Sequence, residues 1–77
     1  MEEKSVTGVI VLVTPFKENS EIIQVITKEY GLMGLLCRGS KKLKSKFLNK
    51  TRIYNYATFQ IKYKKNGLSL ITEINVE

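Results

Sequence analysis

A run of basic residues without an acidic neighbour is the feature of this sequence that bears most directly on chemistry. No Asp or Glu occurs between Glu29 and Glu73. A cluster of one sign repels itself, and a phosphate backbone would relieve that repulsion, although a solvated loop in a Lys-rich chain is the simpler alternative. The candidate phosphate-binding residues are Arg38, Lys41, Lys42, Lys44, Lys46, Lys50 and Arg52.

Aromatic side chains near this run could add base stacking, because single-strand binders stack bases on aromatic rings. Tyr54 and Tyr56 follow Arg52 and alternate with the residues expected in the core, so they are candidate stacking platforms. Packing under a neighbouring loop is the alternative. A second basic group, Lys62, Lys64 and Lys65, has either a binding role or only the solubility role of surface lysines.

The composition favours binding over catalysis. The chain carries 13 basic and 7 acidic residues, a net charge of +6, which suggests a polyanionic partner. Eleven of the basic residues are Lys, which an AT-rich genome would also explain. With no His, no clustered carboxylates and no zinc pattern, we expect no enzyme, no metal and no cofactor. Cys37, the single Cys, is expected to be a buried small hydrophobe in a reducing compartment.

The length of 77 residues allows one small domain, which we assign to residues 1–77. The longest apolar runs are far shorter than the roughly 20 residues of a membrane span. The N-terminus lacks the basic start and apolar core of a signal peptide. A cytoplasmic location is therefore expected.

Five segments have the composition or alternation of β-strands. Residues 6–14 are mostly β-branched and should end at Pro15, and residues 21–28 and 32–38 form two further apolar runs, the first of which also fits a helix face. Residues 57–64 alternate strictly between apolar and polar. Asn66-Gly67 predicts a type I′ turn leading into a fifth strand over 68–76, in which Leu68, Leu70, Ile74 and Val76 share one face.

Between the third and fourth strands lies a basic connector, residues 39–52, in which Leu43, Phe47 and Leu48 could form a short amphipathic helix. Phe47 should anchor this connector to the body of the protein. Five strands in so short a chain favour closure into a barrel that leaves few free edges. The predicted fold is all-β, with at most one short helix: a five-stranded oligonucleotide-binding (OB) barrel, with SH3-like barrels as the main competitor.

Four segments resemble the N-terminal domain of the bacterial RecO family. They are Thr7-Gly8-Val9-Ile10-Val11-Leu12, Glu18-Asn19-Ser20-Glu21 with Glu29-Tyr30-Gly31, Arg38-Gly39-Ser40-Lys41-Lys42 with Lys44-Ser45-Lys46, and Leu70-Ile71-Thr72-Glu73-Ile74. The resemblance covers residues 6–77. It departs at 50–53, where family members often show Gln-Pro-Phe, at 17–20, which lack the usual Gly, and in the missing larger helical domain that follows in the family.

The resemblance implies an OB-fold that binds single- and double-stranded DNA and anneals strands. It also implies work with RecR and single-strand-binding protein in loading the recombinase RecA. Two other functions fit the residues themselves: an RNA-binding barrel of the translation apparatus, and a protein-interaction adaptor that docks acidic tails. A preference for RNA over DNA, or binding to an acidic peptide without binding to DNA, would distinguish them.

Overall fold

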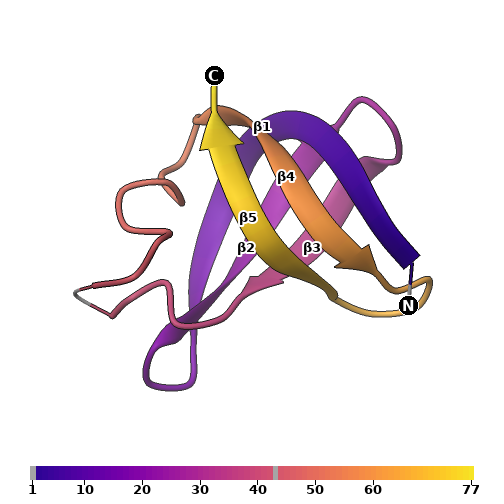
Figure 1. Ribbon diagram of the computed structural model, residues 1–77. Helices are drawn as coiled ribbons and strands as arrows, with labels where there is room; N and C mark the ends of the chain where they lie inside the picture. Colours follow the sequence, from indigo (N-terminus) through magenta and orange to yellow (C-terminus); the bar gives the residue numbers. More distant parts are fainter. Residues whose placement is uncertain (1, 43) are drawn as a thin grey trace.

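The computed structural model describes residues 2–42 and 44–77 and is built from five strands and the turns between them. The strands are β1 (Glu2–Phe16), β2 (Ser20–Thr27), β3 (Gly31–Cys37), β4 (Tyr56–Tyr63) and β5 (Ser69–Val76). They form a closed barrel in the order β1-β2-β3-β5-β4, in which only the β3–β5 pair is parallel (Figure 1). The predicted five-stranded OB barrel is confirmed.

Strand β1 closes the barrel because its two halves pair with different neighbours. The segment from Glu2 to Val9 pairs with β4, and the segment from Gly8 to Phe16 pairs with β2. Gly8 belongs to both ladders, and a Cβ at this position would collide with the main-chain carbonyl of Ile26. A β-bulge between Ile10 and Leu12 then bends the strand. The glycine thus lets three strands approach closely at the crossing.

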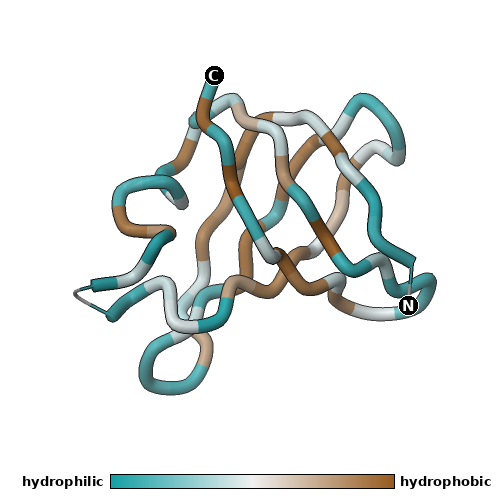
Figure 2. Tube along the Cα trace, viewed as in Figure 1, coloured by the Kyte–Doolittle hydropathy of each residue, from teal (hydrophilic) through white to brown (hydrophobic). Residues whose placement is uncertain are grey.

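The core is mostly aliphatic, with Cys37, Phe47 and Phe59 as its other members. Figure 2 shows that hydrophobic residues recur along the strands of the barrel. Strand β4 follows its predicted alternation, since Ala57, Phe59 and Ile61 are buried between more exposed neighbours. Among the connector residues that the structure describes, Phe47 is the one in the hydrophobic core, as its predicted anchoring role requires. The buried hydrophobic residues are Val6, Ile10, Ile23, Val25, Leu35, Cys37, Phe47, Ala57, Phe59, Ile61, Ile71 and Ile74.

The strand predicted over 6–14 is longer at both ends than the sequence indicated. Pro15 does not end β1, and instead pairs with Glu21, one residue before the last pair of the strand, Phe16 with Ser20. The pairing of β1 with β4 stops at Val9. Among the described residues, the part of β1 that follows Val9 and contains Pro15 therefore has a neighbouring strand, β2, on one side only. A proline is tolerated on such an edge because its missing N–H faces no acceptor strand.

Two local predictions for the β4–β5 hairpin are wrong. Gly67 has a φ of 103°, but Asn66 is not among the residues with positive φ, so the type I′ turn does not form. The loop instead runs from Lys64 to Leu68, and the Lys64 N–H donates to Ser69 Oγ at 3.0 Å. A bulge opposite Gln60 and Ile61 then reverses the faces of β5, so that Ile71 and Ile74 are both buried while Leu68 and Val76 are exposed.

The connector forms a series of tight turns, and no helix occurs in its described part. Main-chain N–H groups donate three residues back, from Lys42 to Gly39, Ser45 to Lys42, Leu48 to Ser45 and Lys50 to Phe47. Ser45 Oγ also accepts from the Phe47 N–H at 3.0 Å, and side-chain competition of this kind disfavours helix. Leu48 is exposed, and Leu43, the third apolar residue of the expected helix, lies outside the described residues.

Residues 2–42 and 44–77 include no helix with the length and the apolar character needed to span a membrane.

Candidate nucleic-acid interface

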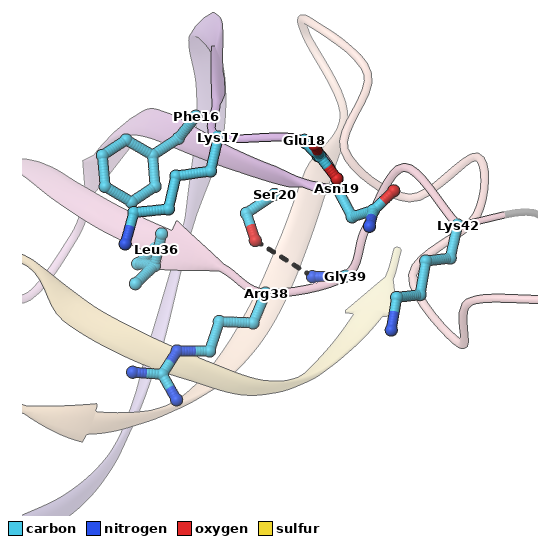
Figure 3. Close-up of a pocket in the computed structure, with 9 residues that line it drawn as sticks. All are labelled: Phe16, Lys17, Glu18, Asn19, Ser20, Leu36, Arg38, Gly39 and Lys42. Carbon is cyan, nitrogen blue, oxygen red and sulfur yellow. Dashed lines mark hydrogen bonds between the residues drawn. The ribbon is translucent and has the colours of Figure 1, made fainter.

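A cavity of about 590 Å³ opens at the end of the barrel where the β1–β2 turn meets the start of the connector (Figure 3). Three cationic side chains line it: Lys17 from the turn, Arg38 just after β3, and Lys42 from the connector. In Figure 3 the charged ends of Lys17, Arg38 and Lys42 lie apart from one another, each on a different segment of the chain. Glu18 is the one acid among the lining residues. The balance of charge at this opening therefore favours an anionic ligand.

The rest of the lining combines apolar surface with hydrogen-bonding groups. Phe16 and Leu36 supply apolar side chains, and the Lys17 ammonium lies 5.4 Å from the centre of the Phe16 ring. Ser20 Oγ accepts a hydrogen bond from the Gly39 N–H at 3.3 Å, which joins the two segments that form the walls. A surface with cations around an aromatic ring can hold both the phosphate and the base of a nucleotide.

The turn that carries Lys17 is tight. Only residues 17–19 separate the paired Phe16 and Ser20, and Lys17 takes the left-handed conformation with a φ of 57°. The Lys41 N–H donates to the Asn19 carbonyl at 3.0 Å, so the connector is fixed to this turn by its main chain. The pairing of β1 with β2 and this bond together place Lys17 opposite Arg38 and Lys42.

Glu21 holds both ends of the connector against β2. Its Oε1 accepts a hydrogen bond from Ser40 Oγ at 2.7 Å and another from Thr51 Oγ1 at 2.9 Å. Ser40 is buried, while Thr51 and Glu21 are half-buried, so these bonds are partly shielded from water. Bonds to a charged acceptor are shorter and stronger than neutral ones. The carboxylate therefore fixes the geometry of a loop that otherwise has little core of its own.

The predicted phosphate-binding residues differ in how free their charged ends are. Arg38, Lys41, Lys42, Lys44 and Lys46 are exposed, and of these Arg38 and Lys42 meet at the cavity. Lys46 Nζ lies 5.3 Å from the centre of the Phe47 ring.

The last two basic residues of the run already have partners within the protein. Lys50 Nζ donates to the Ile74 carbonyl at 3.2 Å, and Arg52 Nη2 donates to Asn49 Oδ1 at 3.0 Å. The Ile74 carbonyl that accepts the bond from Lys50 lies in β5, past Leu70, the last residue of β5 that pairs with β3. Lys50 thus helps to attach the connector to the barrel.

The two predicted stacking residues lie outside the cavity: Tyr56 is the first residue of β4, and Tyr54 lies two residues before it. Tyr54 is 79% exposed and has a φ of 73°, and its N–H donates to the Ile10 carbonyl. Tyr56 is 41% exposed and pairs with Val9. Their rings are accessible, but the structure does not bring them together with Arg38 and Lys42.

Sequence reasoning does not single out Lys17 as a functional residue. The sequence places Phe16 at a strand end, near a loop that OB-folds use for ligands. The same signal could have found Lys17, because OB barrels bind ligands with the loop between their first two strands. Once that fold is expected, a Phe-Lys pair at this turn becomes a candidate ligand contact.

The chain matches the family model described as "Recombination protein O N terminal" over residues 1–77. It is 30% identical over 66 residues to the DNA repair protein RecO of Halalkalibacterium halodurans, and 29% identical over 66 residues to that of Listeria monocytogenes. The Leuconostoc mesenteroides protein of the same name is 27% identical over 71 residues. These alignments cover 86–90% of this chain but only 26–27% of the relatives. By this match, the chain belongs to the RecO N-terminal family.

Proposed function

We propose that this chain is a non-catalytic nucleic-acid-binding module of DNA repair and recombination. The observation that carries the proposal is the meeting of Lys17, Arg38 and Lys42 around one cavity, beside a connector without acidic residues. The cavity adjoins the β1–β2 loop and the end of β3, which is the side of an OB barrel that binds oligonucleotides. Phosphate contacts of this kind supply affinity without reading sequence.

The proposal assigns roles according to the freedom of each side chain. Arg38, Lys41, Lys42, Lys44 and Lys46 contact phosphates, together with Lys17 at the cavity. Lys50 and Arg52 belong to the same set of proposed phosphate contacts. Their bonds to Ile74 and Asn49 also orient the connector. Tyr54 and Tyr56 stack on bases only where a bound strand extends past the connector toward β4.

The names of the curated relatives place them in DNA repair. Carried over to this chain, the proposal is that it binds single- and double-stranded DNA in the cytoplasm, anneals strands and helps to load a recombinase. RecR and single-strand-binding protein are the proposed protein partners. We propose no catalytic step, in keeping with a sequence that contains no His. Within the described residues, no group of His, Cys, Asp or Glu is placed to hold a metal ion.

The test compares two variants that each lose one positive charge. Arg38→Gln removes a cation from the cavity, whereas Lys28→Gln removes an exposed cation from the turn between β2 and β3. Binding of a labelled single-stranded oligonucleotide is measured by fluorescence anisotropy over a series of salt concentrations. We expect Arg38→Gln to weaken binding and to reduce the salt slope by about 0.7, the value for one phosphate contact on a single strand.

Lys28→Gln is expected to bind like the unmodified chain, because its side chain lies at the other end of β2 from the cavity. Equal losses in the two variants would show that binding follows net charge alone, and the assignment of the cavity would be wrong.

A further inference from the structure

The outer face of the sheet formed by β1, β2 and β3 carries no charged side chain, although the chain has 13 basic and 7 acidic residues. The ladder places nine residues on this face, in three rows: Val9–Ile26–Leu32, Leu12–Gln24–Gly34 and Thr14–Ile22–Leu36. Leu12, Ile26 and Leu32 are 51%, 54% and 65% exposed. An uncharged face with several exposed aliphatic side chains is typical of an interaction surface.

This face lacks the groups that hold nucleic acid, although OB barrels in general bind oligonucleotides on strands 2 and 3. None of the nine residues is aromatic, so none offers a ring on which a base can stack, and none is a cation that could contact a phosphate. The cations Lys17, Arg38 and Lys42 lie beyond the strand ends, at the cavity. The surface that fits this face is therefore an apolar protein surface.

The outward residues of β2 read the same in both directions: Ile22, Gln24, Ile26. A two-fold axis that passes by Gln24, across the strands, places Ile22 of each copy against Ile26 of the other. It also places Gln24 against Gln24, and each amide can both donate and accept a hydrogen bond. The row that begins at Thr14 then meets the row that begins at Val9. The face is thus complementary to itself, as a closed dimer requires.

The turns at the two ends of β2 carry opposite charges at positions that the same axis brings together. Glu18 lies in the β1–β2 turn and Lys28 in the β2–β3 turn, and both are exposed. When β2 runs antiparallel to β2 of a second copy, Glu18 of each copy comes beside Lys28 of the other. Such pairs at the rim of an interface add little affinity, but they favour one orientation.

We propose that the β1–β2–β3 face binds a second copy of this chain, with the two β2 strands antiparallel and the two-fold axis at Gln24. Burial of the aliphatic side chains supplies the affinity, and the Glu18–Lys28 pairs set the orientation. The inference goes beyond the proposed function. Because each cationic cavity adjoins the β1–β2 turn, the dimer carries its two cavities at opposite ends of the β2 pair.

The test is sedimentation equilibrium over a series of protein concentrations, in the absence of nucleic acid, with a monomer–dimer equilibrium as the expected result. The double variant Ile26→Gln, Leu32→Gln keeps the net charge and should weaken association at least about tenfold, because each copy loses two apolar side chains from the interface. Val76→Gln is the control, since Val76 is 46% exposed at the end of β5, outside the face. It should associate like the unmodified chain.

Reversal of charge tests the orientation. Glu18→Lys and Lys28→Glu each bring like charges together at both ends of β2, and each should weaken association about twofold to thirtyfold. The variant that carries both changes exchanges the two charges and should associate like the unmodified chain. A folded chain that stays monomeric at every concentration, or a dimer that the Ile26→Gln, Leu32→Gln variant leaves intact, would overturn the proposal. Neither result bears on the cationic cavity, which the nucleic-acid titrations test separately.

Discussion

Glu21 is the residue on which the arrangement of the connector depends most. One carboxylate oxygen accepts hydrogen bonds from Ser40 at the start of the connector and from Thr51 near its end. Apart from Phe47, no described connector residue belongs to the buried hydrophobic core. A few polar contacts therefore set the position of the lysines that we propose to bind phosphate, and the two bonds to the Glu21 carboxylate are the strongest type among them.

Glu21→Ala should lower the free energy of unfolding by about 2 kcal/mol, because hydrogen bonds to a charged group contribute roughly that much each and water replaces part of the loss. Urea denaturation followed by circular dichroism measures this. Glu18→Ala is the matched control, since Glu18 is exposed in the neighbouring turn and should change stability by less than about 0.5 kcal/mol. Equal stabilities of the two variants would contradict the role given to Glu21.

Cys37 is buried at the end of β3, and its environment determines its reactivity. Burial away from water raises the pKa of the Cys37 thiol from 9.0 to about 12. The thiolate is the reactive form, so the native chain at neutral pH should react with a thiol reagent only as fast as the barrel opens. Fast reaction in denaturant, with slow reaction in its absence, is the expected result.

The same shift links Cys37 to stability. Its pKa is higher in the folded state than in the unfolded state, so its contribution is fully present below pH 9.0 and decreases as the pH rises toward about 12. Cys37→Ala should therefore show a smaller fall in unfolding free energy over that range than the unmodified chain. An identical fall in both would mean that the thiol is not desolvated.

At the scale of elements, the crossing of β1 with β2 and β4 is the most constrained point of the barrel. A Cβ at Gly8 would meet main-chain atoms of Ile26 and Thr27, which cannot move without breaking the ladder. A Cβ at Gly34 would lie 2.9 Å from Leu68 Cδ2, the end of a flexible and exposed side chain. Gly8→Ala should cost about 1–3 kcal/mol, and Gly34→Ala much less. Thermal unfolding of both variants tests the difference, and equal melting temperatures would refute it.

All five strands could be predicted from the sequence because composition and alternation report local burial directly. Their limits were less accurate where tertiary pairing decides them. Pro15 remains within β1 because one edge of the strand is free there, a fact that the sequence of β1 does not contain. Similarly, the bulge in β5 depends on its register with β4, so the buried faces of Ile71 and Ile74 could not be assigned from alternation alone.

The candidate site could be predicted only in part, for a related reason. The one-signed charge of the connector is visible in the sequence, and it identifies Arg38 and Lys42. Lys17 lies more than twenty positions earlier and joins them only because the β1–β2 turn is bonded to the connector through Asn19 and Lys41.

At the scale of the whole molecule, the positive charge is concentrated on the connector. Replacing Lys41, Lys42, Lys44 and Lys46 together by Gln should leave the barrel folded, since all four side chains are exposed. Single-strand affinity should fall, and the dependence on salt should become flatter, because fewer counterions are released on binding. Anisotropy at several salt concentrations measures both, and an unchanged affinity would remove the connector from the interface.

The most direct test of the account is a titration of the unmodified chain into a labelled single-stranded oligonucleotide at several salt concentrations, with duplex DNA and RNA as competitors. Three to six phosphate contacts predict a slope of log affinity against log salt between about −2 and −4. DNA should compete at least as well as RNA. No binding at low salt, from a sample shown to be folded, would contradict the central claim that the cavity and the connector form a nucleic-acid interface.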